Sequence, residues 1–309
     1  MPSGERERIR RLLERGRGSE HLVVANGDDA AVLRAEGMGV LSVDASVEGT
    51  HFRASFADWR TLGRRAAIAA LSDLSAMGAA ARALLSSLVL PKDFADDDFD
   101  ALTSGVFEAA DEAGAVVAGG NLAAGSAVSI HTTVIGTCEE PVRRAGASAG
   151  ERLYLSGRPA DASLGLACLL RRDSGKALPT GADVFIERWR RPTMHRLPSG
   201  ATAAIDLSDG LASDVRQLTR ASRVDCELER ASLEGLMGSD FLRVCDQIDA
   251  DPLETLLQGG ESYVLAYAAP DGAQSPEHTA IGTFTAGEGK LLLEGQAIAG
   301  GFDHFAQSD

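Results

Sequence analysis

The chain has 309 residues, enough for two domains, and its 44% hydrophobic and 24% charged residues are typical of an ordered globular protein. A net charge of −15 argues against a general nucleic-acid binder, because no broad basic surface can neutralise phosphates. The charged N-terminus lacks the apolar segment of a signal peptide, and no stretch approaches the roughly 18 apolar residues of a membrane span. The four cysteines form no CxxC pair, so we expect a cytoplasmic protein without a zinc or redox motif.

The N-terminal part predicts strands and helices in mixed order. Apolar spacing in the first helix leaves its arginines on a solvated face, although they could instead contact an anion. Gly78 marks the end of an alanine-rich helix, and the acidic run 93–100 is interpreted as capping and surface. The expected elements are a helix over 5–16, strands over 22–25, 32–33 and 40–43, a helix over 59–77, a strand over 84–90, a helix ending near 113, and strands over 115–118 and 127–136.

A turn-rich stretch at 139–150 is the best candidate for a domain boundary, so we expect domains over 1–138 and 139–309. The elements along the chain lack the regular alternation of a doubly wound sheet, so the sequence predicts an α+β (mixed α/β) fold. The expected elements of the second domain are a strand over 152–156, a helix over 163–171, a strand over 201–207, a helix over 210–221 and a strand over 262–268.

Aspartates occur where strands and helices are expected to meet, next to apolar and small residues. Asp73 lies in the alanine-rich helical segment 66–77, which has no other charged residue, and at helical spacing it shares a face with three alanines and Met77. The alternative is an aspartate on an outer surface or bonded to nearby backbone. Small neighbours favour close approach by a ligand, and carboxylate oxygens suit Mg²⁺, which commonly also binds substrate phosphates. The pattern therefore predicts a metal-dependent enzyme that acts on a phosphorylated substrate.

The segment 205–211 predicts a strand, a turn and a helix. Asp206 ends the strand, and Ser208 or Asp209 is expected to cap the helix. N–H groups at the start of a helix attract phosphate, and Asp206 and Asp209 could hold the cation that the phosphate brings. Capping explains one of these three residues but not all of them.

Two glycine motifs carry little information when each is taken alone. Gly27-Asp28-Asp29 is typical of a tight turn, and Gly119-Gly120-Asn121 of a strand followed by a glycine turn that lets a ligand approach the backbone. No GxxxxGK[ST], GxGxxG or HExxH motif occurs. P-loop kinases, Rossmann enzymes and zincins therefore lose their main support.

In their order along the chain, these short motifs resemble those of the bacterial thiamine-monophosphate kinase family, within the aminoimidazole ribonucleotide synthetase-like superfamily. The resemblance runs from about residue 5 to residue 305. It implies two α/β domains, a homodimer that pairs through the sheets of its N-terminal domains, and ATP- and Mg²⁺-dependent phosphorylation of thiamine monophosphate to thiamine diphosphate. The motifs that carry it are 27–31, Ser42-Val43-Asp44, 48–52, 71–79, Gly119-Gly120-Asn121, 144–146, 205–211, 259–261 and 301–305.

The resemblance also implies roles for individual residues. The implied Mg²⁺ ligands are Asp29, Ser42, Val43 (through its carbonyl), Asp44, Asp73, Asn121, Asp206 and Asp209, with Asp73, Asp206 and Asp209 as catalytic residues. The implied ATP contacts are Gly120, Arg144 and Ser208, and the implied substrate contacts are His51, Glu261 and Phe302. Phe302 could stack on the cationic thiamine rings, and Glu261 could offset their charge.

The chain departs from the usual family motifs at several polar positions. Asn121 stands where the family has Asp, which keeps an oxygen ligand but loses a charge. Ala70, Ala45 and Ser262 stand where the family usually has Asn, Thr and Asp. Two alternatives to an active kinase therefore remain open. One is a relative that activates another small molecule with ATP, and the other is a regulatory protein that binds without turnover.

Overall fold

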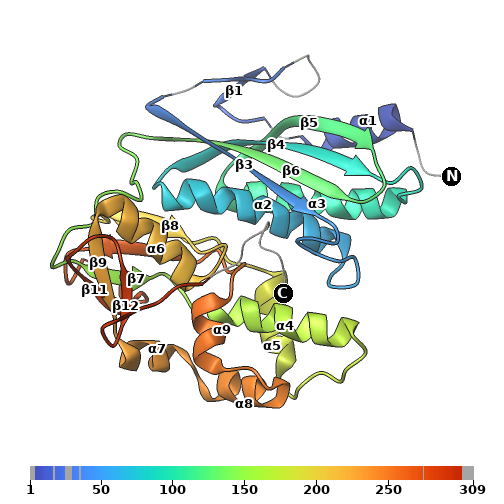
Figure 1. Ribbon diagram of the computed structural model, residues 1–309. Helices are drawn as coiled ribbons and strands as arrows, with labels where there is room; N and C mark the ends of the chain where they lie inside the picture. Colours follow the sequence, from blue (N-terminus) through green and yellow to red (C-terminus); the bar gives the residue numbers. More distant parts are fainter. Residues whose placement is uncertain (1–3, 17, 25–29, 35, 274, 301–309) are drawn as a thin grey trace. The chain divides into compact units, whose positions relative to one another are not determined.

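The computed structural model describes residues 4–16, 18–24, 30–34, 36–273 and 275–300. The chain forms two compact units, Met1–Leu74 with Ala79–Pro141, and Ser75–Gly78 with Val142–Asp309. Both units combine sheets with helices, which confirms the α+β (mixed α/β) class (Figure 1). The boundary at 138/139 and the roles of the two halves stay predictions. Within the described ranges, no helix is both long and apolar enough to cross a membrane.

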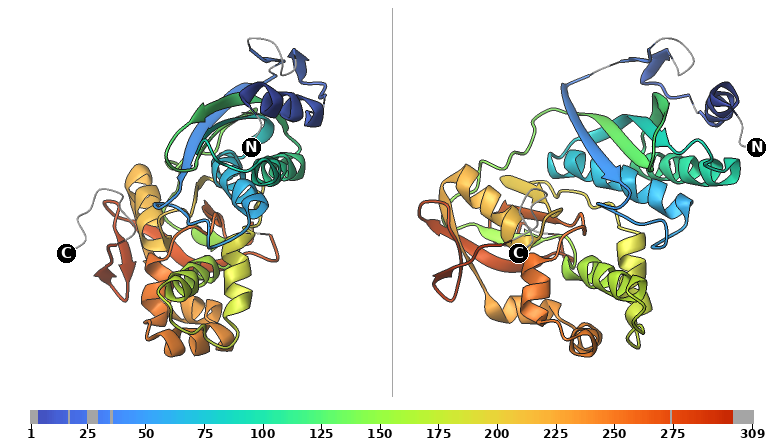
Figure 2. Two further views of the ribbon diagram at one scale, coloured as in Figure 1. Left: turned by 90° about the vertical axis from the view of Figure 1, so that its right-hand side faces the viewer. Right: turned by 45° about the vertical axis from the view of Figure 1, so that its right-hand side comes forward.

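The first unit is built on a mixed sheet with two helices along one face. Its described elements are α1 (Glu5–Arg15), β1 (Leu22–Val24), β2 (Val32–Leu33), β3 (Met38–Val47), α2 (Trp59–Ala76), β4 (Ala80–Leu90), α3 (Asp96–Ala113), β5 (Val116–Ala124) and β6 (Ser129–Cys138). The main sheet has the strand order β3-β6-β4-β5, and α2 and α3 lie along the same face of it (Figures 1 and 2). The two helices pack closely at Gly63, where a Cβ would lie 2.0 Å from the carbonyl oxygen of Leu102. The absence of a side chain at Gly63 permits this contact.

The alanine-rich helix α2 forms where the sequence predicts it. Its core-facing residues, among them Ala67, Ile68 and Leu71, are fully buried. Gly78 adopts a φ of 67°, and the N–H of Ala79 donates to the carbonyl of Leu74 at 2.9 Å. This left-handed C-terminal cap confirms Gly78 as the end of the helix.

Three arginines of α1 pair with acidic residues of α3, so the expectation of a solvated arginine face is wrong for them. The acidic run begins α3 as expected, with three aspartates in its first turn. Arg8 lies 3.4 Å from Asp96, while Arg11 and Arg15 lie 3.1 and 3.3 Å from Asp100. The partners are more than 80 residues apart in the sequence, so local patterns carry no sign of this pairing.

The expected glycine turn at 119–121 is also wrong, because these residues lie inside β5. Ser86 of β4 pairs with Gly120, and a Cβ at Gly120 would lie 1.9 Å from the carbonyl oxygen of Ser86. The register shifts between Leu84 and Leu85 of the neighbouring strand, beside Gly119. Gly120 therefore permits a close approach between two strands, and Gly119 lies beside a bulge. In the sequence alone, these glycines resemble a turn motif.

The second unit packs helices around a larger mixed sheet. Its described elements are β7 (Arg152–Leu155), α4 (Ala160–Asp173), α5 (Ala182–Arg190), β8 (Ala203–Asp206), α6 (Leu211–Ser222), β9 (Val224–Leu228), α7 (Arg230–Leu236), α8 (Ser239–Ile248), α9 (Pro252–Gln258), β10 (Leu265–Ala269), β11 (Thr279–Ala286), β12 (Leu291–Leu293) and β13 (Gln296–Ala297). The strand order is β13-β12-β9-β11-β7-β10-β8. Every residue of β10 is buried, and the rings of Tyr154 and Tyr267 stack with centroids 5.4 Å apart. The core thus fixes β8, which carries Asp206 at its end.

Candidate functional site

Three predicted metal ligands of the first unit share one region of the sheet and its covering helix. Ser42 and Asp44 occupy alternate positions of β3, so their side chains point to the same face. The hydroxyl of Ser42 donates to the Oδ2 of Asp73 in α2 at 2.5 Å. Asp73 is half-buried beside the buried Ala69 and Ala70. The structure therefore brings Ser42 and Asp73 into contact, with Asp44 on the same side.

Asp44 and Asn121 lie at opposite edges of this sheet. Across the strands, Asp44 pairs with Thr132, Thr132 with Ser86, and Ser86 with Gly120. Three strand spacings of about 4.8 Å separate the edges by about 14 Å, whereas Mg²⁺ holds its ligands at about 2.1 Å. One chain therefore does not bring Asp44 and Asn121 to the same ion.

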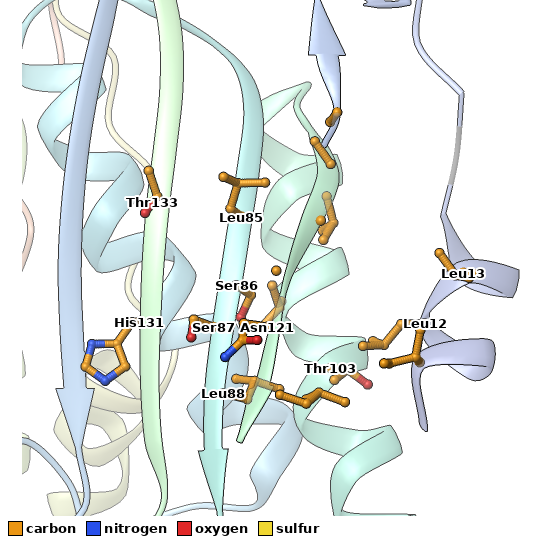
Figure 3. Close-up of a pocket in the computed structure, with 18 of the residues that line it drawn as sticks. Leu12, Leu13, Leu85, Ser86, Ser87, Leu88, Thr103, Asn121, His131 and Thr133 are labelled. Atoms are coloured by element: carbon orange, nitrogen blue, oxygen red, sulfur yellow. The ribbon is translucent and has the colours of Figure 1, made fainter. Parts of the chain in front are cut away.

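Gly120 and Asn121 line a pocket of about 730 Å³ in the first unit (Figure 3). Ser87 of β4 pairs with Asn121 on one side and with His131 on the other, which sets a polar row across three strands. Apolar residues of α1 form the opposite wall, among them Leu12 and Leu13. The pocket thus combines a row of polar side chains with many apolar ones, which suits a ligand that has both apolar and polar groups.

His51 is held by the backbone just after β3. The N–H of Val47 donates to its Nδ1 at 3.1 Å, and its own N–H donates to the carbonyl of Val47 at 2.9 Å. The accepting Nδ1 places the proton of the neutral ring on Nε2. The predicted substrate contact therefore has a fixed ring orientation.

In the second unit, the predicted segments 205–211 and 259–261 lie side by side. The N–H of Glu261 donates to the carbonyl of Ser208 at 2.8 Å, and the N–H of Tyr263 donates to Leu207 at 3.0 Å. Gly260 permits this contact, because a Cβ there would lie 2.2 Å from the carbonyl oxygen of Ser208. A predicted ATP contact and a predicted substrate contact are thus joined by a backbone hydrogen bond.

Asp206 ends β8 as predicted, but the expected cap of α6 is wrong. The N-cap residue is Gly210, and no side chain of the cap closes the helix start. Instead, the Oδ2 of Asp214 accepts the N–H groups of Asp209 and Gly210 at 3.0 and 3.2 Å. The buried Asp214 thus accepts two N–H groups at the start of the helix, where the sequence predicts that such groups bind a phosphate.

The environment of Asp214 favours its protonated form. Burial, together with the nearby charges of Asp209 and Asp206, raises the pKa of this carboxyl to about 7. The two backbone N–H groups oppose this shift because they stabilise the carboxylate.

Arg144, a predicted ATP contact, belongs to the same network. Its Nη1 donates to the Oε1 of Gln217 at 2.7 Å, and the Nε2 of Gln217 donates to Asp214 Oδ1 at a longer 3.4 Å. The guanidinium presents a planar fork of donors that suits phosphate oxygens.

Glu261 is bound by an aromatic residue that belongs to none of the sequence motifs. The indole N–H of Trp189, at the end of α5, donates to the Oε2 of Glu261 at 2.6 Å. In the sequence, Asp214 could have been found only as an acid in the apolar stripe of a helix. Nothing in the sequence near Trp189 predicts its hydrogen bond to Glu261.

Two predicted residues, Asp29 and Phe302, lie outside the described residues. In the part of the chain that the structure describes, no three acidic, histidine or cysteine side chains converge on a metal site. The donors present still fit Mg²⁺, which takes hard oxygen ligands and is often held by one or two carboxylates with waters and substrate phosphates. Asp44, Asp73, Asp206 and Asp209 supply such oxygens in the two units.

Comparisons with known proteins cover the whole chain. Residues 27–138 match the family model of AIR synthase related protein, N-terminal domain. The chain is 31% identical to thiamine-monophosphate kinase of Mycobacterium tuberculosis over 99% of its own length and 93% of that protein. It is 32% identical to thiamine-monophosphate kinase of Salmonella typhimurium over 99% of each chain. The solved structure of AaThiL complexed with AMPPCP and TMP matches with a TM-score of 0.80 at 29% identity, covering 97% of this chain and 95% of that one.

Proposed function

This chain belongs to the thiamine-monophosphate kinase family, and we propose that it transfers the γ-phosphoryl group of ATP directly to thiamine monophosphate. An oxygen of the thiamine monophosphate phosphate forms a bond to the γ-phosphorus, the bond from that phosphorus to ADP breaks, and thiamine diphosphate and ADP leave. The attacking oxygen already belongs to an ionised phosphate, so no side chain has to remove a proton. The task of the protein is to align two phosphates and offset their charge.

We assign Asp73, Asp206 and Asp209 to the reacting phosphates, as catalytic residues and Mg²⁺ ligands. When bound, Mg²⁺ would neutralise charge on the phosphates during transfer of the γ-phosphoryl group. The chain's own contribution is to hold the carboxylates in place, and the Ser42 hydroxyl at Asp73 supports this role. The further proposed ligands are Asp29, Ser42, the Val43 carbonyl, Asp44 and Asn121, and the proposed ATP contacts are Gly120, Arg144 and Ser208.

The observation that carries the proposal is the bonded pair of loops in the second unit. Ser208, assigned to ATP, and Glu261, assigned to the acceptor, are joined by a backbone hydrogen bond of 2.8 Å. A phosphoryl donor and an acceptor must lie within bonding reach of each other, which this pairing favours. His51 and Phe302 complete the proposed acceptor contacts.

We also propose a homodimer that pairs through the sheets of the first units. Asp44 and Asn121 sit at opposite edges of one sheet, so a second copy would be needed to bring both to one metal site. Leu41 and Val43 of the edge strand β3 are 67% and 66% exposed, an apolar surface that pairing would cover. Sedimentation of the wild type should give a dimer, and Leu41→Glu with Val43→Glu should give a monomer. A monomeric wild type would refute the pairing.

The reaction is tested by incubating the purified protein with ATP, Mg²⁺ and thiamine monophosphate and separating the thiamine species chromatographically. We expect thiamine diphosphate and equimolar ADP only when all three are present, and no product after addition of EDTA. We propose that the protein is cytoplasmic, which accords with its use of ATP and thiamine phosphates. ATP binding without thiamine diphosphate would instead favour another acceptor, or a protein that binds without turnover.

A further inference from the structure

Trp189 makes a buried polar contact with a residue of the proposed acceptor site. Its side chain is 0% exposed, and its indole N–H donates to the Oε2 of Glu261 at 2.6 Å. A short bond from a neutral donor to a carboxylate is among the stronger hydrogen bonds of proteins. The contact therefore restricts the orientation of the Glu261 carboxylate.

Helix α4 holds both partners of this bond. It packs against α5 at Gly165, where a Cβ would lie 2.1 Å from the carbonyl oxygen of Phe185. Two residues earlier, the hydroxyl of Ser163 donates to the carbonyl of Gly260 at 3.3 Å. One rigid helix thus fixes the helix that bears Trp189 and the loop that bears Glu261.

The backbone at Glu261 adopts a conformation that is rare for residues other than glycine. Its φ is 64° and that of Tyr263 is 56°, both in the left-handed region. Such residues cost free energy unless the surroundings hold them, and they gather at ligand sites. The hydrogen bonds that Trp189 and Ser163 donate, and the one that the carbonyl of Ser208 accepts, hold this segment in place.

We propose that Trp189 is a positioning residue that aims the Glu261 carboxylate at the cationic part of the acceptor. This inference rests on the proposed function, which assigns Glu261 to thiamine monophosphate. An indole N–H donates without carrying a positive charge, so it orients the carboxylate without adding a cation that would repel a thiazolium ring.

Kinetics of two variants separate positioning from packing. Trp189→Phe keeps an aromatic ring but loses the donor, and Trp189→His keeps a ring N–H. We expect Trp189→Phe to lower kcat/KM for thiamine monophosphate on the order of tenfold, with the KM for ATP changed less than twofold. Trp189→His should recover most of the loss. Trp59→Phe is the matched control, since it makes the same change at the other of the two tryptophans and packs instead against Phe52 and Phe94.

Fluorescence gives a readout that does not depend on turnover. In the Trp59→Phe background, Trp189 is the single tryptophan of the chain. We expect thiamine monophosphate to shift or quench its emission in a saturable way, and Glu261→Gln to abolish most of that response at the same ligand concentration.

The outcomes distinguish this inference from the proposed function. A wild type that neither binds nor converts thiamine monophosphate would overturn both. Normal turnover by the wild type with unchanged kcat/KM in Trp189→Phe would overturn the inference alone. So would equal losses for both substrates together with a lower melting temperature, because that pattern marks a packing role.

Discussion

Asp73 and Asp214 are both aspartates that lie among apolar residues of a helix, yet the structure gives them different environments. Asp73 is half-buried, lies beside small alanines and accepts the hydroxyl of Ser42. Asp214 is 1% exposed and takes two backbone N–H groups of the loop that carries Asp209. The comparison shows that an acid on the apolar side of a helix can be a candidate ligand or a part of the scaffold, and that its exposure and its backbone partners decide which.

The sharpest test of this difference is Asp73→Asn. The amide keeps the size of the side chain but loses the charge that a Mg²⁺–phosphate complex requires, so we expect kcat to fall more than about a hundredfold. The melting temperature should stay within about 2 °C, because Asn retains an oxygen acceptor for Ser42. Asp97→Asn, at an exposed position of α3, is the matched control and should keep wild-type turnover. Wild-type kcat in Asp73→Asn would remove its assigned role.

Asp214→Ala should act on stability rather than only on turnover. Its loss leaves the N–H groups of Asp209 and Gly210 without their acceptor, so the free energy of unfolding should fall by about 2 kcal/mol. Asp214→Asn keeps a carbonyl oxygen and should lose less. Urea denaturation of the three proteins measures the difference. An unchanged midpoint for Asp214→Ala would place this residue outside the scaffold.

The raised pKa of Asp214 predicts a pH dependence that Asp214→Asn lacks. Its folded pKa is about 7 against an ordinary value of 3.8, so between these values the folded chain holds a proton that the unfolded chain has released. This group therefore lowers the free energy of unfolding as the pH rises from about 4 to 7, and its effect levels off above 7. Urea titrations in EDTA at several pH values should show a shallower decline for Asp214→Asn. Identical slopes in both proteins would contradict the assignment.

The smallest expected effect concerns a buried hydroxyl that, unlike Asp214, lacks a partner. Among the described residues, the Oγ1 of Thr132 is buried without a hydrogen bond. Thr132→Val keeps the shape and should raise the free energy of unfolding by about 1 kcal/mol. Thr103 is the matched control, because its hydroxyl donates to the carbonyl of Phe99 and accepts from Arg15, each at 2.8 Å. Thr103→Val should therefore destabilise the protein, and two changes of the same sign would contradict this explanation.

Features set by neighbours in the chain could be predicted from the sequence. The alanine-rich helix with Gly78 at its end and the strand ending at Asp206 follow from spacing and capping. The family resemblance also placed the segments around Ser208 and Glu261 at one site, and the structure sets them in contact.

Features set by distant partners could not be predicted in the same way. Gly120 looks like a turn residue until β4 is placed beside it, and the arginines of α1 look solvated until Asp96 and Asp100 are placed opposite them. The bond from Trp189 to Glu261 spans 72 residues and has no local signature. In each case a tertiary contact decides the role of a residue whose local pattern suggests a simpler one.

The pairing of α1 with α3 has a consequence for the pocket of the first unit. The apolar side of α1 is only loosely covered, since Ile9 and Leu13 are 38% and 39% exposed, while its arginines carry the attachment to Asp96 and Asp100. The same helix forms one wall of the pocket that contains Asn121. Ionic strength weakens partly exposed ion pairs far more than it weakens the packed sheet. We therefore expect added salt to loosen the α1 wall of this pocket while the wall formed by the sheet stays in place.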